Sequence, residues 1–203
     1  MVITLFRHGV TEENKRKAYL GWNDSPLCGE EKKRLASLHL TEEYDLFFSS
    51  DLERCLATLR LLEPKVDPII VPEFREMCFG EFEGKTYHDL KENVQYKSWL
   101  EDWLSYSPPG GESYEAFSAR IISGWNRILD ILLEKQARGA FIMTHGGVIK
   151  YLLTRFAPEE KNFWEWSTPH GNGFELTFDL SGIRRGDRCT LLRVVPLTEK
   201  ETG

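Results

Sequence analysis

Histidine and arginine side chains follow two segments that we expect to be buried strands. Arg7 and His8 come directly after the apolar run 2–6, and His145 follows the apolar run 140–143. Because the carboxyl ends of parallel strands meet at one edge of a sheet, these side chains can converge although they are far apart in sequence. An imidazole near neutral pH can act as a nucleophile or exchange a proton, and side chains at this edge lie where ligands bind. The alternative for Arg7 and His8 alone is a strand with a solvated basic end.

A third segment strengthens this prediction. The run 46–48 ends in Ser49-Ser50-Asp51 and leads to Arg54. Ser or Asp at this point can cap the helix that we expect to follow, and the amino ends of that helix and of the one after Gly146 add partial positive charge. Arginine offers a planar fork of donors that matches phosphate oxygens, so the strand ends together predict an anion site. The competing interpretations are a solvated helix face for Arg54 and a turn cap for His145.

Strands alternate with helices along most of the chain. Strands are expected at 2–6, 46–48, 69–71, 140–143, 174–178 and 191–195, and helices at 52–62, 113–138 and 148–156. Ser113 is placed to cap the long helix and Gly139 to end it. This alternation predicts an α/β fold with a mainly parallel sheet covered on both faces.

The composition is that of an ordinary globular protein. The 203 residues carry 26 Lys+Arg and 32 Asp+Glu, a formal charge of −6, which argues against non-specific nucleic-acid binding. The length suits a single domain over residues 1–203. The four cysteines are widely spaced, so we expect reduced thiols in a cytoplasmic protein, and we find no signal peptide or spanning segment.

The chemical residues lie in blocks whose order and spacing are specific. The blocks are Arg7-His8-Gly9 with Thr11 and Asn14, Ser50-Asp51-Leu52-Glu53-Arg54, Arg75-Glu76 with Phe79-Gly80-Glu81-Phe82-Glu83-Gly84, Pro109-Gly110-Gly111-Glu112-Ser113, and Thr144-His145-Gly146-Gly147. This arrangement resembles the histidine phosphatase superfamily, the phosphoglycerate-mutase-like proteins. The resemblance implies a three-layer α/β/α sandwich with a mostly parallel central sheet.

The resemblance also implies a role for each residue. His8 would be the nucleophile that forms a phosphohistidine, and positive neighbours would favour its neutral form. A backbone carbonyl, such as that of Gly9, is expected to hold its second ring nitrogen. Arg7, Arg54 and His145 would clamp the phosphoryl oxygens, which makes a metal or other cofactor unnecessary.

Glu76 is the expected general acid and then base. Repulsion from a bound phosphate dianion would favour its protonated form, so that it can protonate the leaving alcohol and later activate water. Glu81 and Glu83 are close competitors, but the family spacing, an acid four residues before Gly80, selects Glu76.

Weaker expectations concern substrate contacts. Asn14 and Thr11 would bind the phosphoryl group, with a helix cap or turn as the alternative for Asn14, and Gly146 would present the helix amino end. Specificity is expected near Gly21 and Trp22 and in a lid over about 81–113, where Trp99 and Trp103 are one turn apart on an expected helix. Packing onto the core is the alternative for at least one of these two rings.

The short middle region favours a phosphatase over a mutase. Mutases of the superfamily carry adjacent arginines there, whereas no arginine lies between Gly84 and Pro108 of this chain. The sequence is most similar to the phosphatase branch, which includes alpha-ribazole phosphatases and broad-specificity bacterial phosphatases, so the expected partner is a small-molecule phosphate ester. Three alternatives remain: a phosphoglycerate mutase, a metal-dependent hydrolase with His8, His145 and Glu76 as ligands, and a non-catalytic phosphate-binding module.

Overall fold

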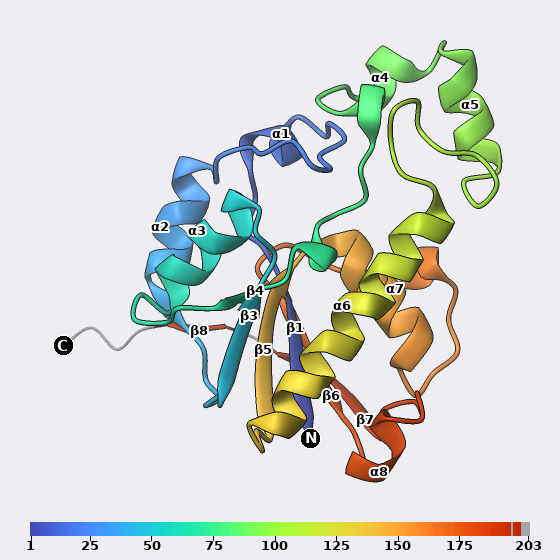
Figure 1. Cartoon of the computed structure of the whole chain (residues 1–203). Coiled ribbons are helices and arrows are strands. Elements are labelled where there is room, and N and C mark those ends of the chain that lie inside the picture. Colours follow the sequence, from blue (N-terminus) through green and yellow to red (C-terminus); the bar gives the residue numbers. More distant parts are fainter. Residues whose placement is uncertain (196, 200–203) are drawn as a thin grey trace.

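The computed structural model describes residues 1–195 and 197–199, and within them one six-stranded sheet has the order β4-β3-β5-β1-β6-β7 (Figure 1). The strands are β1 (Val2–Arg7), β3 (Leu46–Ser49), β4 (Ile69–Ile70), β5 (Gly139–Thr144), β6 (Gly173–Thr177) and β7 (Leu191–Val195). The first four in the sheet order are parallel, whereas β6 and β7 add antiparallel. The predicted mostly parallel sheet is therefore confirmed.

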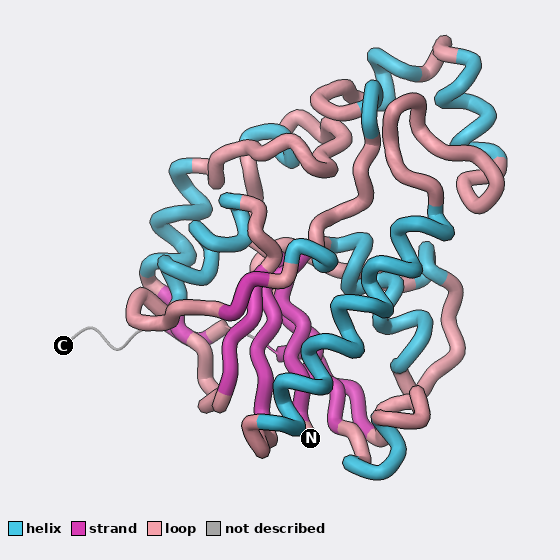
Figure 2. Tube along the Cα trace, in the orientation of Figure 1, coloured by secondary structure: helices cyan, strands magenta, loops and turns pink. Residues whose placement is uncertain are grey.

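Helices cover both faces of the sheet because successive strand side chains point to opposite faces. Ala140 and Ile142 of β5 belong to the larger core, together with residues of α6 and α7, whereas Phe141 and Met143 belong to a second core with α2 and α3. The bounds of these helices are α2 (Gly29–Ala36), α3 (Glu53–Leu62), α6 (Tyr114–Glu134) and α7 (Gly146–Phe156). Figure 2 shows the resulting three layers, which the family resemblance implied.

The long helix α6 begins as predicted and ends early. The Ser113 side chain accepts a hydrogen bond from the backbone N–H of Ala116 (3.1 Å), so the predicted cap is confirmed. The helix ends at Glu134 rather than near Arg138, because Gln136 adopts a left-handed backbone conformation (φ 55°) that turns the chain. Gly139, which we expected to end the helix, begins β5 instead.

Residues 81–113 form an excursion beyond the carboxyl edge of the sheet (Figure 1). It contains α4 (Tyr87–Leu90) and α5 (Val94–Glu101), which follow the short 3-10 helix η2 (Gly80–Phe82). Its own small hydrophobic cluster is Phe82, Leu90, Tyr96 and Trp99. The predicted helix that joins Trp99 to Trp103 is wrong, because α5 ends at Glu101. Trp103 still packs against this cluster, and its ring also contacts Tyr114, Phe163 and Trp164.

The two ends of this excursion are held together at the core. The N–H of Glu81 donates to the carbonyl of Pro109 (2.9 Å), and the N–H of Glu112 donates to the carbonyl of Cys78 (2.9 Å). Gly80 lies at φ 52°, and a Cβ there would be 2.2 Å from the Pro109 carbonyl oxygen. Only glycine therefore allows the two chain segments to approach this closely.

The remaining elements are short. They are α1 (Glu12–Lys15), α8 (Leu180–Ile183), the 3-10 helices η1 (Pro72–Phe74) and η3 (Phe163–Glu165), and a separate antiparallel pair of β2 (Leu38–His39) with β8 (Thr198–Glu199). None of the helices in the described ranges has the length and apolar character that crossing a bilayer requires.

Candidate active site

His8 lies buried directly after β1, at the carboxyl edge of the sheet. Its Nδ1 is 2.7 Å from the carbonyl oxygen of Gly9. A carbonyl only accepts, so Nδ1 carries the proton and Nε2 keeps its lone pair. The expected Gly9 acceptor is therefore confirmed. Burial lowers the pKa of His8 well below its ordinary value, and the charges of Arg54 and Arg7 lower it further, so the imidazole is neutral at neutral pH.

Arg54 is completely buried in the first turn of α3 and is oriented from three sides. Its Nη2 donates to the carbonyl of Gly21 (2.6 Å), its Nη1 donates to the carbonyl of Asn23 (2.9 Å), and its Nε donates to Nδ1 of His145 (3.3 Å). A buried guanidinium with this many partners has one fixed orientation. Arg54 is thus a preset cation beside the two histidines, rather than a solvated helix residue.

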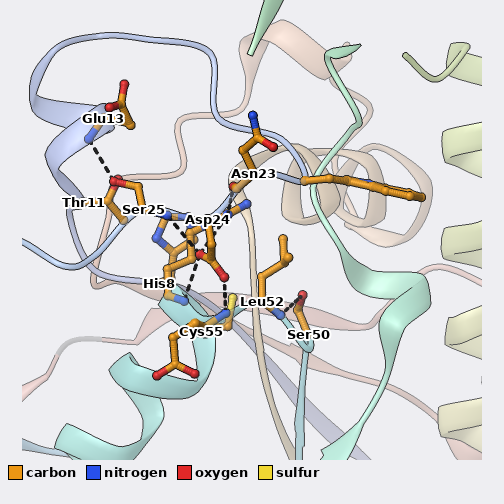
Figure 3. A network of polar contacts seen from close by, with 12 residues as sticks. His8, Thr11, Glu13, Asn23, Asp24, Ser25, Ser50, Leu52 and Cys55 are labelled. Atoms are coloured by element: carbon orange, nitrogen blue, oxygen red, sulfur yellow. Dashed lines mark hydrogen bonds and ion pairs between the residues drawn. The ribbon is translucent and has the colours of Figure 1, made fainter. Parts of the chain in front are cut away.

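The amino end of α3 is capped by Asp24, a residue from a separate loop that no local sequence pattern marks as a cap. The Asp24 carboxylate accepts from the backbone N–H groups of Glu53 and Arg54, and Figure 3 shows it facing this first turn. The predicted cap from Ser50 or Asp51 is wrong: Ser50 Oγ is 3.4 Å from the Leu52 nitrogen, and Asp51 pairs with Arg75. Asp24 also contacts the Arg54 guanidinium (3.3 Å), so one carboxylate fixes both the helix end and the cation.

His145 is fully buried next to His8, with ring centroids 5.2 Å apart. Arg54 Nε can only donate, so His145 Nδ1 accepts, and its Nε2–H must then donate to Ser50 Oγ (2.9 Å). Burial lowers the pKa of His145 well below its ordinary value, with Arg54 and His8 adding to the shift. Both nitrogens of this neutral ring therefore have protein partners.

Arg7 presents an unused donor to the site. Its Nη1 donates to the carbonyl of Thr168 (2.6 Å), whereas its buried Nε has no hydrogen-bond partner in the described part of the chain. Buried donors without partners are rare in native proteins, so an acceptor is expected to reach this atom from outside. Gly146 lies against the guanidinium: a Cβ there would be 2.9 Å from Arg7 Cζ. The glycine lets the amino end of α7 approach the cation.

Glu76 faces the amino end of α7. Its Oε1 accepts from the N–H of Met77 (2.9 Å), and its Oε2 accepts from the N–H of Gly147 (2.9 Å). The rival Glu83 is used elsewhere, because it accepts from the N–H groups of Trp22 and Phe79. Glu81 is exposed. The structure therefore brings Glu76, not its two neighbours, to the site.

Arg120 of α6 holds the segment that carries Glu76. Its guanidinium donates to the carbonyls of Glu73 (2.7 Å), Arg75 (2.7 Å) and Glu76 (2.9 Å), and it pairs with Glu112. Arg120 could not be selected from the sequence, because an arginine on an amphipathic helix carries no local sign that it binds three carbonyls.

The weaker expectations fall on residues with structural contacts. Thr11 caps α1, and Asn14 Oδ1 accepts from its N–H (3.2 Å) and Oγ1 (3.0 Å). The Gly21 carbonyl holds Arg54, and the Trp22 indole N–H donates to the Glu76 carbonyl (2.9 Å). Gly21 and Trp22 therefore support Arg54 and the Glu76 segment, whereas Thr11 and Asn14 form the cap of α1. Contacts of all four residues with substrate stay predictions.

A pocket of about 440 Å³ opens beside Arg7, Glu76, Gly146 and Gly147. Much of its surface is an aromatic wall that comes from four segments, formed by Tyr19, Phe79, Trp99, Trp103, Phe163 and Trp164. Thr168 and Lys150 complete its polar lining. Trp99 and Trp103 of the expected specificity region line this pocket, whereas Tyr19, Phe163 and Lys150 were not selected from the sequence because no motif marks them.

His170 is a third histidine, close to His8. Its ring centroid lies 5.4 Å from that of His8, and its Nε2 is buried without a partner in the described ranges. Burial lowers its pKa to about 3, with Arg7 contributing, so it too is neutral at neutral pH. His170 and Asn14 line a second, smaller cavity. Tyr19 lines this cavity as well and also belongs to the aromatic wall of the first pocket.

The described residues hold no group of three or more His, Cys, Asp or Glu side chains that could bind a metal ion. All four cysteines are unpaired thiols.

Comparisons with known proteins indicate which family this chain resembles. Residues 3–184 match the family model of the histidine phosphatase superfamily (branch 1). The adenosylcobalamin/alpha-ribazole phosphatase of Escherichia coli (strain K12) is 33% identical over 163 residues, which cover 76% of this chain and 78% of that protein. A 2,3-bisphosphoglycerate-dependent phosphoglycerate mutase of Cytophaga hutchinsonii is 29% identical over 196 residues, 90% of this chain and 92% of the mutase.

Solved structures show the same relation. The crystal structure of the alpha-ribazole phosphatase from Shigella flexneri has a TM-score of 0.82 and 27% sequence identity, and the match covers 96% of each chain. That of a putative alpha-ribazole-5'-P phosphatase from Escherichia coli has a TM-score of 0.80 and covers 97% of this chain and 96% of that one, at 28% identity.

Proposed function

Since this chain belongs to the histidine phosphatase superfamily, we propose that it hydrolyses small-molecule phosphomonoesters through a phosphohistidine on His8. The observation that carries the proposal is the state of that ring. Its Nδ1–H is bound to the Gly9 carbonyl, burial and two arginines keep it neutral, and its Nε2 lone pair is available for attack on phosphorus.

Two arginines balance the charge of the transferring group. Arg7 offers its unpartnered Nε, and Arg54 contributes a guanidinium fixed by backbone carbonyls. Preset cations of this kind stabilise charge on the phosphoryl oxygens without reorganising during the reaction. His145 keeps Arg54 in place, and its Nε2–H would have to leave Ser50 to reach a phosphoryl oxygen itself. Gly146 brings the amino end of α7 to the same anion.

Glu76 performs the proton transfers in this scheme. In the first step His8 Nε2 bonds to phosphorus, the ester P–O bond breaks, and Glu76 gives its proton to the leaving alkoxide oxygen. In the second step Glu76 takes a proton from water, the water oxygen bonds to phosphorus, and the P–N bond breaks to release phosphate and neutral His8. The carboxylate is held between Met77 and Gly147 for both steps.

Hydrolysis is favoured over mutase activity by the excursion at 81–113, which we propose acts as the specificity region of a single domain. It lacks arginine between Gly84 and Pro108, so it offers no guanidinium to a phosphoglycerate carboxylate. The aromatic wall suits a leaving group that contains a ring, and an alpha-ribazole phosphate is therefore one candidate substrate. The four free thiols support a cytoplasmic location.

Turnover of p-nitrophenyl phosphate in EDTA tests the mechanism. We expect metal-independent activity that is abolished by His8→Ala and strongly reduced by Glu76→Gln. His88→Ala, which removes an exposed histidine of α4, is the matched control and should retain full activity. Mass spectrometry of protein quenched during turnover should place the phosphoryl group on His8.

Other outcomes identify the alternatives. Activity lost in EDTA and restored by zinc would indicate a metal-dependent hydrolase. Phosphate binding without turnover of any ester would indicate a binding module. Phosphoryl transfer to phosphoglycerate faster than to water would indicate a mutase. A panel with alpha-ribazole phosphate, sugar phosphates and 3-phosphoglycerate then ranks the substrates.

A further inference from the structure

Lys150 stands in the pocket without an acidic partner. It lies on α7, half-buried, and its ammonium is 4.9 Å from the ring centroid of Trp164 and 5.6 Å from that of Phe163. In the described part of the chain no carboxylate lies within ion-pair distance of this nitrogen. Contacts with two aromatic faces hold the ammonium in one region while leaving its N–H donors free.

The charges that line the pocket do not balance. Glu76 is the single acidic side chain in the lining, and its oxygens already accept two backbone N–H groups. Arg7 and Lys150 are both basic. Burial lowers the pKa of Lys150 and Arg7 lowers it further, whereas the carboxylate of Glu76 offsets part of this shift. An arriving anion would relieve this imbalance.

The position of Lys150 separates it from the phosphoryl group. It is four residues after Gly146, on the same face of α7, which places it about 6 Å further along the helix axis from the amino end. Arg7 and Gly146 line the end of the pocket where the phosphoryl group would bind, whereas Lys150 contacts the part of the aromatic wall formed by Phe163 and Trp164. A group bound to Lys150 therefore belongs to the leaving alcohol.

We propose that Lys150 and the aromatic wall form a subsite for a leaving group that carries both a ring and a second acidic group, such as a carboxylate. This proposal rests on the proposed function, because it describes the leaving group of that reaction. The ring would lie against Trp103, Phe163 and Trp164, and the acidic group would accept hydrogen bonds from the Lys150 ammonium.

Two aryl phosphates of nearly equal shape test the subsite. One is 4-carboxyphenyl phosphate, and the other is its uncharged analogue 4-carbamoylphenyl phosphate. We expect the wild-type kcat/KM to favour the carboxylate about tenfold, as for a partly buried ion pair worth about 1.4 kcal/mol. In Lys150→Met this ratio should fall to about one, while kcat/KM for the carbamoyl compound changes less than about threefold. Methionine keeps the packing against the rings.

Controls separate the subsite from other effects. Lys150→Arg should retain part of the preference, and Lys33→Met, which removes an exposed charge on α2, should retain all of it. Equal losses on both substrates would show that Lys150 acts on the phosphoryl group or on the fold and would overturn the proposal, as would a wild-type enzyme without preference. Failure of the proposed function looks different, since turnover of both esters would then not require His8.

Discussion

Replacing Gly147 with alanine should displace the carboxylate of Glu76, the proposed general acid, without changing Glu76 itself. A Cβ at this position would lie 2.2 Å from Glu76 Oε1 and 3.1 Å from its Cδ. Carbon and oxygen atoms approach to about 3.3 Å, so either the carboxylate or the start of α7 must move by about 1 Å. The move also breaks the hydrogen bond from the Gly147 N–H to Oε2.

A displacement of this size at a reacting group costs on the order of 10²-fold in rate, which is about 2.7 kcal/mol of transition-state stabilisation. We therefore expect Gly147→Ala to lower kcat on p-nitrophenyl phosphate about 100-fold and to leave KM within about threefold. Gly29→Ala is the matched control: it lies in the first turn of α2, and an added Cβ there has no neighbour within 4 Å.

A double-mutant cycle shows whether the effect passes through Glu76. If it does, adding Gly147→Ala to Glu76→Gln should reduce kcat little further, because the carboxylate contribution is already lost. Our interpretation is refuted if Gly147→Ala retains more than about half of the wild-type kcat. It is also refuted if the loss is undiminished in the Glu76→Gln background, which would place the damage in the phosphoryl site.

Three further outcomes follow from the same contacts. Asp24→Ala removes the cap of α3 and the partner of Arg54, so the free energy of unfolding measured in urea should fall by about 1–2 kcal/mol, with Asp24→Asn retaining most of the cap. Arg120→Lys cannot bind three carbonyls, so it should lower kcat about tenfold by loosening the Glu76 segment, and a kcat equal to wild type would contradict this role. The pKa of His170 is about 3 in the folded chain, so below about pH 6.5 the unfolded chain binds a proton that the folded chain does not. The contribution of His170 to stability is complete above that pH and is lost as the pH falls towards 3. His170→Gln should therefore reduce the slope of the unfolding free energy against pH, between pH 6 and 4, by up to about 1.4 kcal/mol per pH unit. An unchanged slope would show that the folded histidine binds the proton.

Features that follow from the type of an element, or from residues adjacent in the chain, were predictable from the sequence. The residues at the strand ends converge because the parallel sheet brings them to one edge, and the Gly9 carbonyl is adjacent to the ring it binds. The Ser113 cap needs only the first turn of its helix. In each case, local geometry fixes the contact once the strand or helix is identified.

Features that depend on distant segments were not predictable in this way. Asp24 caps α3 from a separate loop, and Arg120 of α6 donates to the carbonyls of the segment that carries Glu76. Lys150 has an ordinary place in an amphipathic helix until the chain brings Phe163 and Trp164 beside it. The early end of α6 depends on Gln136, a residue type with no strong preference for a left-handed turn.

The pinned base of the 81–113 excursion has an evolutionary consequence. The chain leaves the core at Gly80 and returns at Pro109–Gly111, and backbone hydrogen bonds close this junction. The proposed nucleophile His8, the two arginines Arg7 and Arg54, and the proposed general acid Glu76 all lie outside the closed segment. A descendant could therefore replace or lengthen the 81–113 excursion. Its preference among phosphate esters would then change, while the residues around His8 would stay the same.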